Sequence, residues 1–362
     1  MSSRCWAALT VSQRQRTSTN QRRPSRPVRI THARTHAHPD HCSDDRIFNG
    51  EEANVADYPY LVSLRVISPT FPSCAGTLIR PNVVLTAAHC VLWGSEFVPT
   101  LTAVPLAGAY LPIVVPAVDV PNPPTDPLPS GGKQVETGAI SVHSRFQPDN
   151  PNVNAEGAGY DIALLFLKEE LSGPGISTIE IAPRGSTYTS GEAFGIVGWG
   201  SYNPDPANPF EAEYPPPTLR DGEVYYVPPE QCLDDWEAIN INPMFADPIE
   251  LERSILNPVV MCALGLEGTN GVRTDTCNGD SGGPMTLDDG GTPVQVGIVA
   301  WGNGCGGTTP SLYTNVAFMH DWIERQLKLW DDVQPWTLGS DGFKLWDRVL
   351  ARFNKEEDDD DS

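Results

Sequence analysis

The sequence predicts an all-β protein that ends in one amphipathic helix, and three observations lead to this fold class. Proline (35) and glycine (32) are both abundant among the 362 residues, which favours many short segments joined by turns. Apolar runs of strand length recur between turn residues, as in Tyr60–Ile67, Ala163–Leu167, Gly195–Trp199 and Val294–Trp301. Near the C-terminus, apolar residues from Met319 to Trp330 recur at three- and four-residue steps, which is the period of a helix with one apolar face.

The chain divides by composition into three parts. Residues 1–46 hold nine Arg and three Asp, a net charge of +6, and form a basic leader that we expect to be disordered. The leader resembles a transit peptide more than a secretory signal, and a wrongly placed start codon is the alternative. Residues 47–330 form the globular body. Residues 331–362 form a tail with an acidic end, Glu356–Asp361, which we expect to be solvated.

The charge and the hydropathy of the chain exclude two classes of partner. Because the leader contributes +6 to a total of −22, the remaining residues carry −28 and offer no surface that would neutralise nucleic-acid phosphates. The uncharged stretch Phe97–Val118 is long enough to cross a bilayer. Its four prolines, however, remove backbone donors that lipid cannot replace. We therefore expect neither nucleic acid nor a membrane as a partner.

The eight cysteines favour an oxidising compartment. They include no CxxC pair and no Cys/His cluster at zinc-ligand spacing. An even count without metal spacing favours disulfides, and we expect neither a metal nor another cofactor. A reduced protein with scattered buried thiols is the alternative.

One segment carries a candidate nucleophile. Thr276–Pro284 reads T-C-N-G-D-S-G-G-P, with glycines on both sides of Ser281 that permit a tight turn and close approach of a substrate. The N–H groups of Gly279 and Ser281 are candidates for an oxyanion hole. Taken alone, the G-x-S-x-G pattern is weak, because α/β-hydrolases also use it.

Two further segments carry a candidate base and a candidate carboxylate. His89 lies in L-T-A-A-H-C, directly after an apolar run, and Asp161 opens the apolar run Y-D-I-A-L-L-F-L. A lone histidine is more often structural than catalytic, and a strand-start aspartate often makes only local turn contacts. Acyl transfer needs all three groups, a nucleophile, a base and an orienting carboxylate.

Together the three segments resemble the trypsin/chymotrypsin family of serine proteases, over roughly residues 46–330. The order His, Asp, Ser differs from the orders in α/β-hydrolases and subtilisins. The resemblance implies two six-stranded antiparallel Greek-key barrels with a C-terminal helix. It also implies that His89 is the general base, that Asp161 orients it, and that Ser281 attacks the substrate while Gly279 and Ser281 hold the oxyanion.

The same resemblance implies that the chain is a precursor. Arg46-Ile47-Phe48-Asn49-Gly50 stands where the family has its activation site. Cleavage after Arg46 frees the amino group of Ile47, which then pairs with Asp280 and supplies that carboxylate with a charge partner. Phe48 and Asn49 depart from the family pattern, whereas Ile47 matches it.

The resemblance also implies three disulfides and leaves two cysteines over. The implied pairs are Cys74–Cys90, Cys232–Cys262 and Cys277–Cys305. Cys5 and Cys42 remain in the leader, where they either pair with each other or stay free.

By resemblance, Asp275 is the floor of the pocket for the side chain that precedes the cut. An aspartate at this place selects Arg or Lys, and Gly302 keeps the pocket wall open. Ser311 stands where trypsins have glycine, and its hydroxymethyl group either crowds the pocket or hydrogen-bonds Asp275. Ala300 replaces a serine that usually bonds the catalytic aspartate, so Asp161 should lose one hydrogen bond.

The function that follows is a serine endopeptidase that cleaves after Arg or Lys through an acyl-enzyme. We expect a secreted monomer whose partners are protein or peptide substrates and protein protease inhibitors. The competing interpretation, from another class, is a catalytically silent, protease-like binding protein. Such relatives usually lack one residue of the triad, whereas this chain has all three.

Overall fold

The described part of the chain belongs to one unit. The computed structural model describes residues 47–65, 74–91, 113–116, 135–146, 160–200, 219–239, 252–253, 255–268 and 271–333. The chain divides into two units, residues 1–43 and 44–362, and all of the described residues lie in the second. The predicted leader, the acidic end and most of Phe97–Val118 therefore lie outside the described residues.

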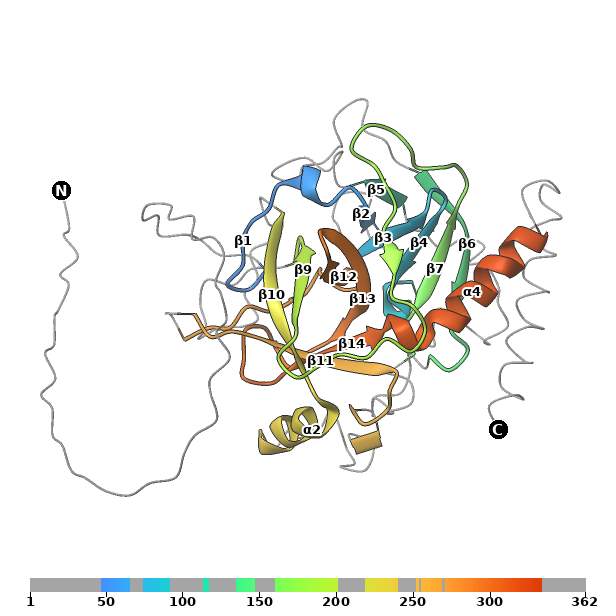
Figure 1. Cartoon of the computed structure of the whole chain (residues 1–362). Coiled ribbons are helices and arrows are strands. Elements are labelled where there is room, and N and C mark those ends of the chain that lie inside the picture. Colours follow the sequence, from blue (N-terminus) through green and yellow to red (C-terminus); the bar gives the residue numbers. More distant parts are fainter. Residues whose placement is uncertain are drawn as a thin grey trace, which may run out of the picture. The chain divides into compact units, whose positions relative to one another are not determined.

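The first half of the body is a closed barrel of six antiparallel strands (Figure 1). Its spatial order is β2-β3-β4-β7-β6-β5, with β5 paired back onto β2. The strands are β2 (Leu61–Arg65), β3 (Cys74–Arg80), β4 (Val83–Thr86), β5 (Ile113–Pro116), β6 (Val135–Val142) and β7 (Ala163–Leu167). This order, in which a meander of three strands is followed by a long return, is a Greek key.

The second half repeats this strand order. Here β9 pairs with β10 and also with β12, which closes the ring β9-β10-β11-β14-β13-β12. Its strands are β9 (Ala193–Gly198), β10 (Arg220–Val227), β11 (Val260–Gly265), β12 (Pro284–Asp289), β13 (Thr292–Trp301) and β14 (Ser311–Asn315). The prediction of two six-stranded Greek-key barrels is confirmed.

Two short strands enlarge the second sheet beyond the prediction. β1 (Glu51–Glu52) pairs with β10, and β8 (Glu180–Ile181) pairs with β13. The β8–β13 pairing is parallel, so the second sheet as a whole is not purely antiparallel. Both strands have two residues, too few to leave an alternating pattern in the sequence.

The C-terminal helix α4 (Val316–Val333) follows β14 and contacts the second sheet as well as the first barrel. The rings of Trp330 and Phe166 are stacked with their centroids 4.1 Å apart. The run from Ile162 to Leu167 is at most 1% exposed because both faces of β7 are covered, which explains its unbroken apolar sequence. The helix extends past the expected end of the body at residue 330, and Asp331 pairs with Arg80 at 2.9 Å.

Three of the shorter helices are η1 (Val55–Asp57), η2 (Ala88–Cys90) and α2 (Pro229–Ala238). Helix α2, in which Cys232 and Trp236 are buried four residues apart, was not predicted from the sequence. No helix among the described residues is both long and apolar enough to cross a membrane.

Candidate active site

Strand pairing in the first barrel brings His89 and Asp161 together although 72 positions separate them. β4 ends at Thr86 and leads into η2, which carries His89, while Asp161 lies just before β7. Thr86 and Ala163 are direct partners in the antiparallel ladder. The end of β4 and the beginning of β7 therefore lie at the same rim of the barrel.

The Asp161 carboxylate holds His89 through two hydrogen bonds. Oδ1 accepts the main-chain N–H of His89 at 2.8 Å, and Oδ2 lies 2.6 Å from the ring Nδ1. Burial by itself lowers the pKa of His89, but the charge of Asp161 and its hydrogen bond raise it, and the net effect is a pKa above 6.5. Because Nδ1 is engaged by Asp161, Nε2 is the nitrogen left to exchange a proton with a nucleophile.

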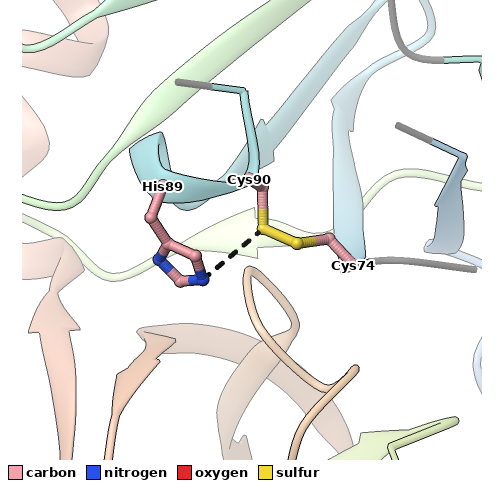
Figure 2. A group of neighbouring side chains, drawn as sticks. All are labelled: Cys74, His89 and Cys90. Atoms are coloured by element: carbon pink, nitrogen blue, oxygen red, sulfur yellow. Dashed lines mark hydrogen bonds between the residues drawn. A yellow bond between two sulfur atoms is a disulfide. The ribbon is translucent and has the colours of Figure 1, made fainter. Parts of the chain in front are cut away.

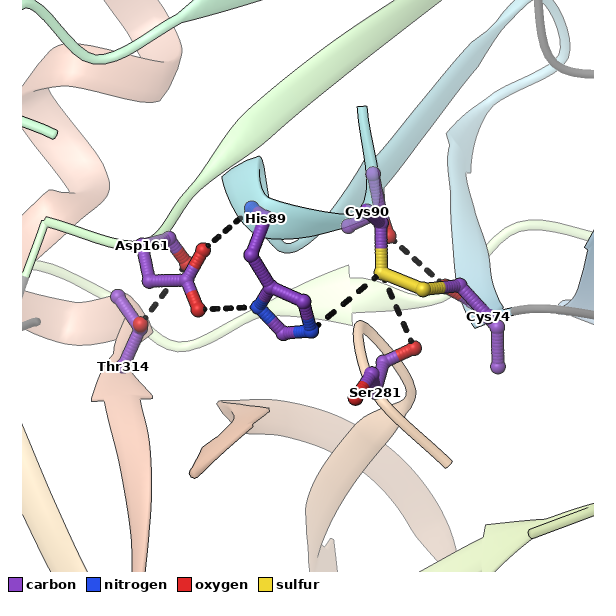
Figure 3. A network of polar contacts seen from close by, with 8 residues as sticks. Cys74, His89, Cys90, Asp161, Ser281 and Thr314 are labelled. Carbon is purple, nitrogen blue, oxygen red and sulfur yellow. Dashed lines mark hydrogen bonds and ion pairs between the residues drawn. A yellow bond between two sulfur atoms is a disulfide. The ribbon is translucent and has the colours of Figure 1, made fainter. Parts of the chain in front are cut away.

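Ser281 comes to this site from the second barrel, in the loop that leads into β12. Figure 3 shows it on the Nε2 side of the imidazole, with Asp161 on the opposite side. The Ser281 carbonyl accepts the N–H of Ala75 at 2.8 Å. Sγ of Cys90 lies 3.5 Å from that carbonyl oxygen and 3.9 Å from Nε2 of His89. The structure thus brings the predicted base, carboxylate and nucleophile into one cluster.

Gly282 makes this close approach of the two barrels sterically feasible. Its φ is +77°, and a Cβ at this position would lie 2.5 Å from the main-chain oxygen of Ala75 and 2.1 Å from Oγ1 of Thr86. The N–H of Gly282 donates to Val299 in β13 at 2.9 Å. A side chain here would push the Ser281 loop away from the first barrel.

The predicted disulfides all form, and one of them borders the site. Figure 2 shows Cys74 and Cys90 joined beside the ring of His89. These three residues place potential metal-ligand atoms within 4.8 Å of one another. Because both sulfurs are in the disulfide, they are not the thiolates that a metal would require. Cys5 and Cys42 lie outside the described residues.

Asp280 is fully buried beneath the Ser281 loop. Its Oδ1 accepts the N–H of Gly200 at 2.6 Å, and its Oδ2 accepts the N–H of Cys277 at 2.8 Å. Burial raises the pKa of this carboxyl to about 7, against the opposing effect of the two hydrogen bonds. No cationic side chain of the described residues contacts it.

The predicted activation segment is docked beside this loop. Ile47 is 2% exposed, and the Phe48 carbonyl accepts the N–H of Asp275 at 3.0 Å. Ile47 (φ 39°) and Asn49 (φ 58°) are the two non-glycine residues with positive φ in the described part of the chain. For a β-branched residue such as Ile47 this backbone conformation is strained. Arg46 itself lies outside the described residues.

The predicted pocket residues lie together. Oδ1 of Asp275 accepts hydrogen bonds from Oγ of Ser311 at 2.6 Å and the N–H of Thr276 at 2.8 Å, and Oδ2 accepts the N–H of Gly306 at 2.9 Å. Burial raises the pKa of Asp275 to about 6, although these bonds act in the opposite direction. A Cβ on Gly302 would lie 3.0 Å from Oγ of Ser311, so Gly302 borders the same space.

The predicted oxyanion residues lie in one tight turn. The N–H of Asp280 donates to the carbonyl of Cys277 at 2.9 Å, and Gly279 adopts a φ of 101°. This conformation explains why glycine precedes the Asp280–Ser281 pair.

Sequence reasoning missed two residues that support the site. Oγ1 of Thr314 donates to the main-chain oxygen of Asp161 at 2.9 Å, so β14 of the second barrel holds a residue of the first. Trp236 of α2 stacks on Trp301 with centroids 4.9 Å apart and donates Nε1–H to Pro310. The spacing of Trp236 from Cys232, four residues, could have indicated a buried helix face. Thr314 lies at an ordinary strand position, and nothing in the sequence indicates its contact with Asp161.

A separate cavity of about 560 Å³ lies beside the activation segment, away from the triad. Asn49, Glu51 and residues of β9 and β10 line it, and the Tyr58 hydroxyl bonds Asp221 at its wall. None of His89, Asp161 and Ser281 borders this cavity.

Comparisons with known proteins identify the family of this chain. The family model described as Trypsin matches residues 47–107 and 128–323. Hypodermin-B of Hypoderma lineatum is 27% identical over 288 residues, which cover 79% of this chain and 89% of that protein. The vitellin-degrading protease of Bombyx mori is 26% identical over 286 residues, or 78% of this chain and 86% of that protein. Since the family model covers more than half of the sequence, the chain belongs to the trypsin family of serine proteases.

Proposed function

We propose that this chain is an active serine endopeptidase that cleaves after Lys or Arg. The observation that carries the proposal is the convergence of His89, Asp161 and Ser281, with Nδ1 of the histidine bound to a carboxylate and Nε2 facing the serine. In this role Nε2 takes the Ser281 hydroxyl proton as Oγ attacks the substrate carbonyl. The same nitrogen then protonates the departing amine, and water hydrolyses the acyl-enzyme.

The oxyanion of the tetrahedral intermediate is assigned to the N–H groups of Gly279 and Ser281. Its support is the position of both residues in one turn, which the buried Asp280 fixes from below. The Asp275 carboxylate at the pocket floor supplies the negative charge for a basic side chain of the substrate. A buried carboxylate discriminates strongly because an apolar side chain would leave it without a charge partner.

Cleavage after Arg46 is proposed as the activating step. The strained φ of Ile47 supports it, because this angle is defined by the peptide bond to residue 46 and ceases to exist once that bond is cut. The new ammonium group would provide the cation that the buried Asp280 lacks among the described residues. The three disulfides support an oxidising compartment, and we propose secretion on that ground.

The test uses protein cleaved after Arg46 and matched peptide amides that end in Lys, Arg, Phe or Ala, beside a Ser281→Ala control. We expect hydrolysis of the Lys and Arg peptides, which the control should reduce by at least about 10³-fold. Cleavage after Phe or Ala instead would overturn the role of Asp275 and keep the triad. No hydrolysis at all, with Ile47 verified as the new N-terminus, would favour the catalytically silent binding protein.

A further inference from the structure

The two oxygens of the Asp275 carboxylate accept different numbers of hydrogen bonds. Oδ1 already accepts two hydrogen bonds, from Oγ of Ser311 and the N–H of Thr276, whereas Oδ2 accepts one, from Gly306. Asp275 is 7% exposed and Ser311 is 4% exposed, so both side chains are buried. A carboxylate offers about four lone-pair positions, and the remaining capacity is therefore greater on Oδ2.

The Ser311 hydroxyl also takes up room beside that carboxylate. It lies 2.6 Å from Oδ1 of Asp275, and a Cβ on Gly302, at the end of the neighbouring strand, would be only 3.0 Å from it. Gly302 directly follows β13 and Ser311 begins β14, and these strands are paired with Trp301 opposite Leu312. The hydroxymethyl group therefore stands next to both the carboxylate and the Gly302 wall, and it shortens the space that a long side chain can enter.

Arginine and lysine side chains need different arrangements of hydrogen-bond acceptors at the bottom of the pocket. A guanidinium group is planar and binds best with two parallel N–H bonds to the two oxygens of one carboxylate. Ser311 opposes that arrangement because its hydroxyl already holds Oδ1. An ammonium group is compact and carries three N–H donors on one atom. It can bond Oδ2 and also Oγ of Ser311, since a hydroxyl that donates its proton keeps two acceptor lone pairs.

We propose that Ser311 is a specificity-determining residue that makes the pocket select Lys over Arg. The inference rests on the proposed function of Asp275 as the pocket floor. The serine hydroxyl acts in two ways: it supplies a second acceptor for an ammonium, and it removes the room and the free oxygen that a guanidinium needs.

The experiment compares the cleaved enzyme with its Ser311→Gly and Ser311→Ala variants on paired peptide amides that differ only in Lys or Arg before the cut. We expect the unaltered enzyme to have a higher kcat/KM for Lys, by about 10-fold, the size of effect that one misfitting contact produces. Ser311→Gly should reduce the Lys-to-Arg ratio at least 10-fold, mainly through a lower KM for Arg. Ser311→Ala keeps the β-carbon, and it should weaken Lys hydrolysis with a smaller gain for Arg.

A binding measurement separates this proposal from the failure of the proposed function. In a Ser281→Ala background, calorimetric titration with butylammonium and butylguanidinium ions measures the pocket without turnover. Tighter binding of the ammonium ion, reversed or abolished by Ser311→Gly, supports the proposal even if no peptide is hydrolysed. The proposal would be overturned if the three proteins, unaltered, Ser311→Gly and Ser311→Ala, agreed within about twofold in their Lys-to-Arg ratios of kcat/KM and in their relative affinities for the two ions. This outcome would count whether or not the peptides are cleaved.

Discussion

His143 illustrates how one residue of this fold couples stability to pH. It follows β6 and is 8% exposed, with its ring between Tyr160 (centroids 4.5 Å apart) and Trp322 (5.4 Å). Its Nδ1 accepts the N–H of Arg145 at 3.2 Å. Burial lowers the pKa of His143 to about 3, and the positive charges of Arg145 and Arg325 act in the same direction.

This depressed pKa predicts a loss of stability in acid. The unfolded chain takes up the proton near pH 6.5 and the folded chain only near pH 3, so the contribution of His143 is complete above pH 6.5 and disappears as pH falls toward 3. The free energy of unfolding should decrease by about 1.4 kcal/mol per pH unit in this window from His143 alone. Urea unfolding of the protein and of His143→Phe, which keeps a ring but cannot titrate, would measure the difference. Equal slopes between pH 6 and pH 4 would contradict the assignment.

The residues of the candidate site differ in how far the sequence could identify them. Ser281, His89 and Asp161 lie in short blocks whose chemistry is local, so their types and their order along the chain are informative by themselves. The sequence left two roles open for Ser311: its hydroxyl does bond Asp275, whereas crowding of the pocket stays a prediction. The bond from Thr314 to Asp161 could not be predicted, because it joins a side chain of one barrel to the backbone of the other.

At the scale of elements, α2 supports the candidate pocket from outside. Cys232 ties this helix to Cys262 in β11, and Trp236 contacts the chain just before both pocket residues. Its stacking partner Trp301 precedes Gly302, and its hydrogen-bond acceptor Pro310 precedes Ser311. The helix thus contacts the end of β13 and the residue before the start of β14, next to Gly302 and Ser311.

We therefore predict that changes at Trp236 act on substrate binding more than on the chemical step. Trp236→Phe keeps an aromatic ring but loses the bond to Pro310, and it should raise KM for a Lys peptide about 3- to 10-fold with kcat within about twofold. Trp330→Phe is the matched control, since that tryptophan stacks on Phe166 under α4. Steady-state kinetics and thermal unfolding of both variants are the measurements. An equal effect of both variants on KM would show that Trp236 contributes only general stability.

The sequence predicted strands better than it predicted their connections. Ala163–Leu167 was recognised at its observed bounds because both faces of β7 are buried and the apolar run is unbroken. By contrast, α2 has a weak apolar face with two buried residues, and its place depends on a disulfide and an indole stack. Such tertiary contacts leave little periodicity, so pattern reasoning passed over the helix.

At the scale of the whole molecule, the two barrels share one strand order although the sequence shows no internal repeat. In both, the first three strands form a meander and the fourth pairs back onto the first. The candidate site forms where the barrels meet. The same boundary holds a buried bond from Thr77 of β3 to Gln295 of β13, 2.5 Å long. Two barrels can share a strand order while their residues differ. Comparing the two halves of the sequence therefore does not reveal the shared order.

The charge of the whole molecule predicts slow self-activation. Asp44 and Asp45 precede Arg46 directly, and these acidic residues should be repelled by a protease body whose charge is strongly negative. Purified precursor incubated at low salt should convert slowly, and Asp44→Asn/Asp45→Asn should convert several-fold faster. Added salt should reduce the difference, because it screens exposed charges. Conversion can be followed by the appearance of Ile47 as an N-terminus; rapid spontaneous conversion of the unaltered precursor would contradict the prediction.

Closure of both barrels bears on how the chain would withstand self-digestion if it has the proposed protease activity. Proteolytic cleavage concentrates at exposed loop tips, because paired strands do not present their backbone to a protease. Every strand of the two rings already has partners on both sides, so self-digestion is directed to the connecting segments. The chain contains only five lysines, and Lys168 lies at an exposed bend immediately after β7. If the proposed preference for lysine holds, the bond after Lys168 is the place among the described residues where self-digestion is expected to begin.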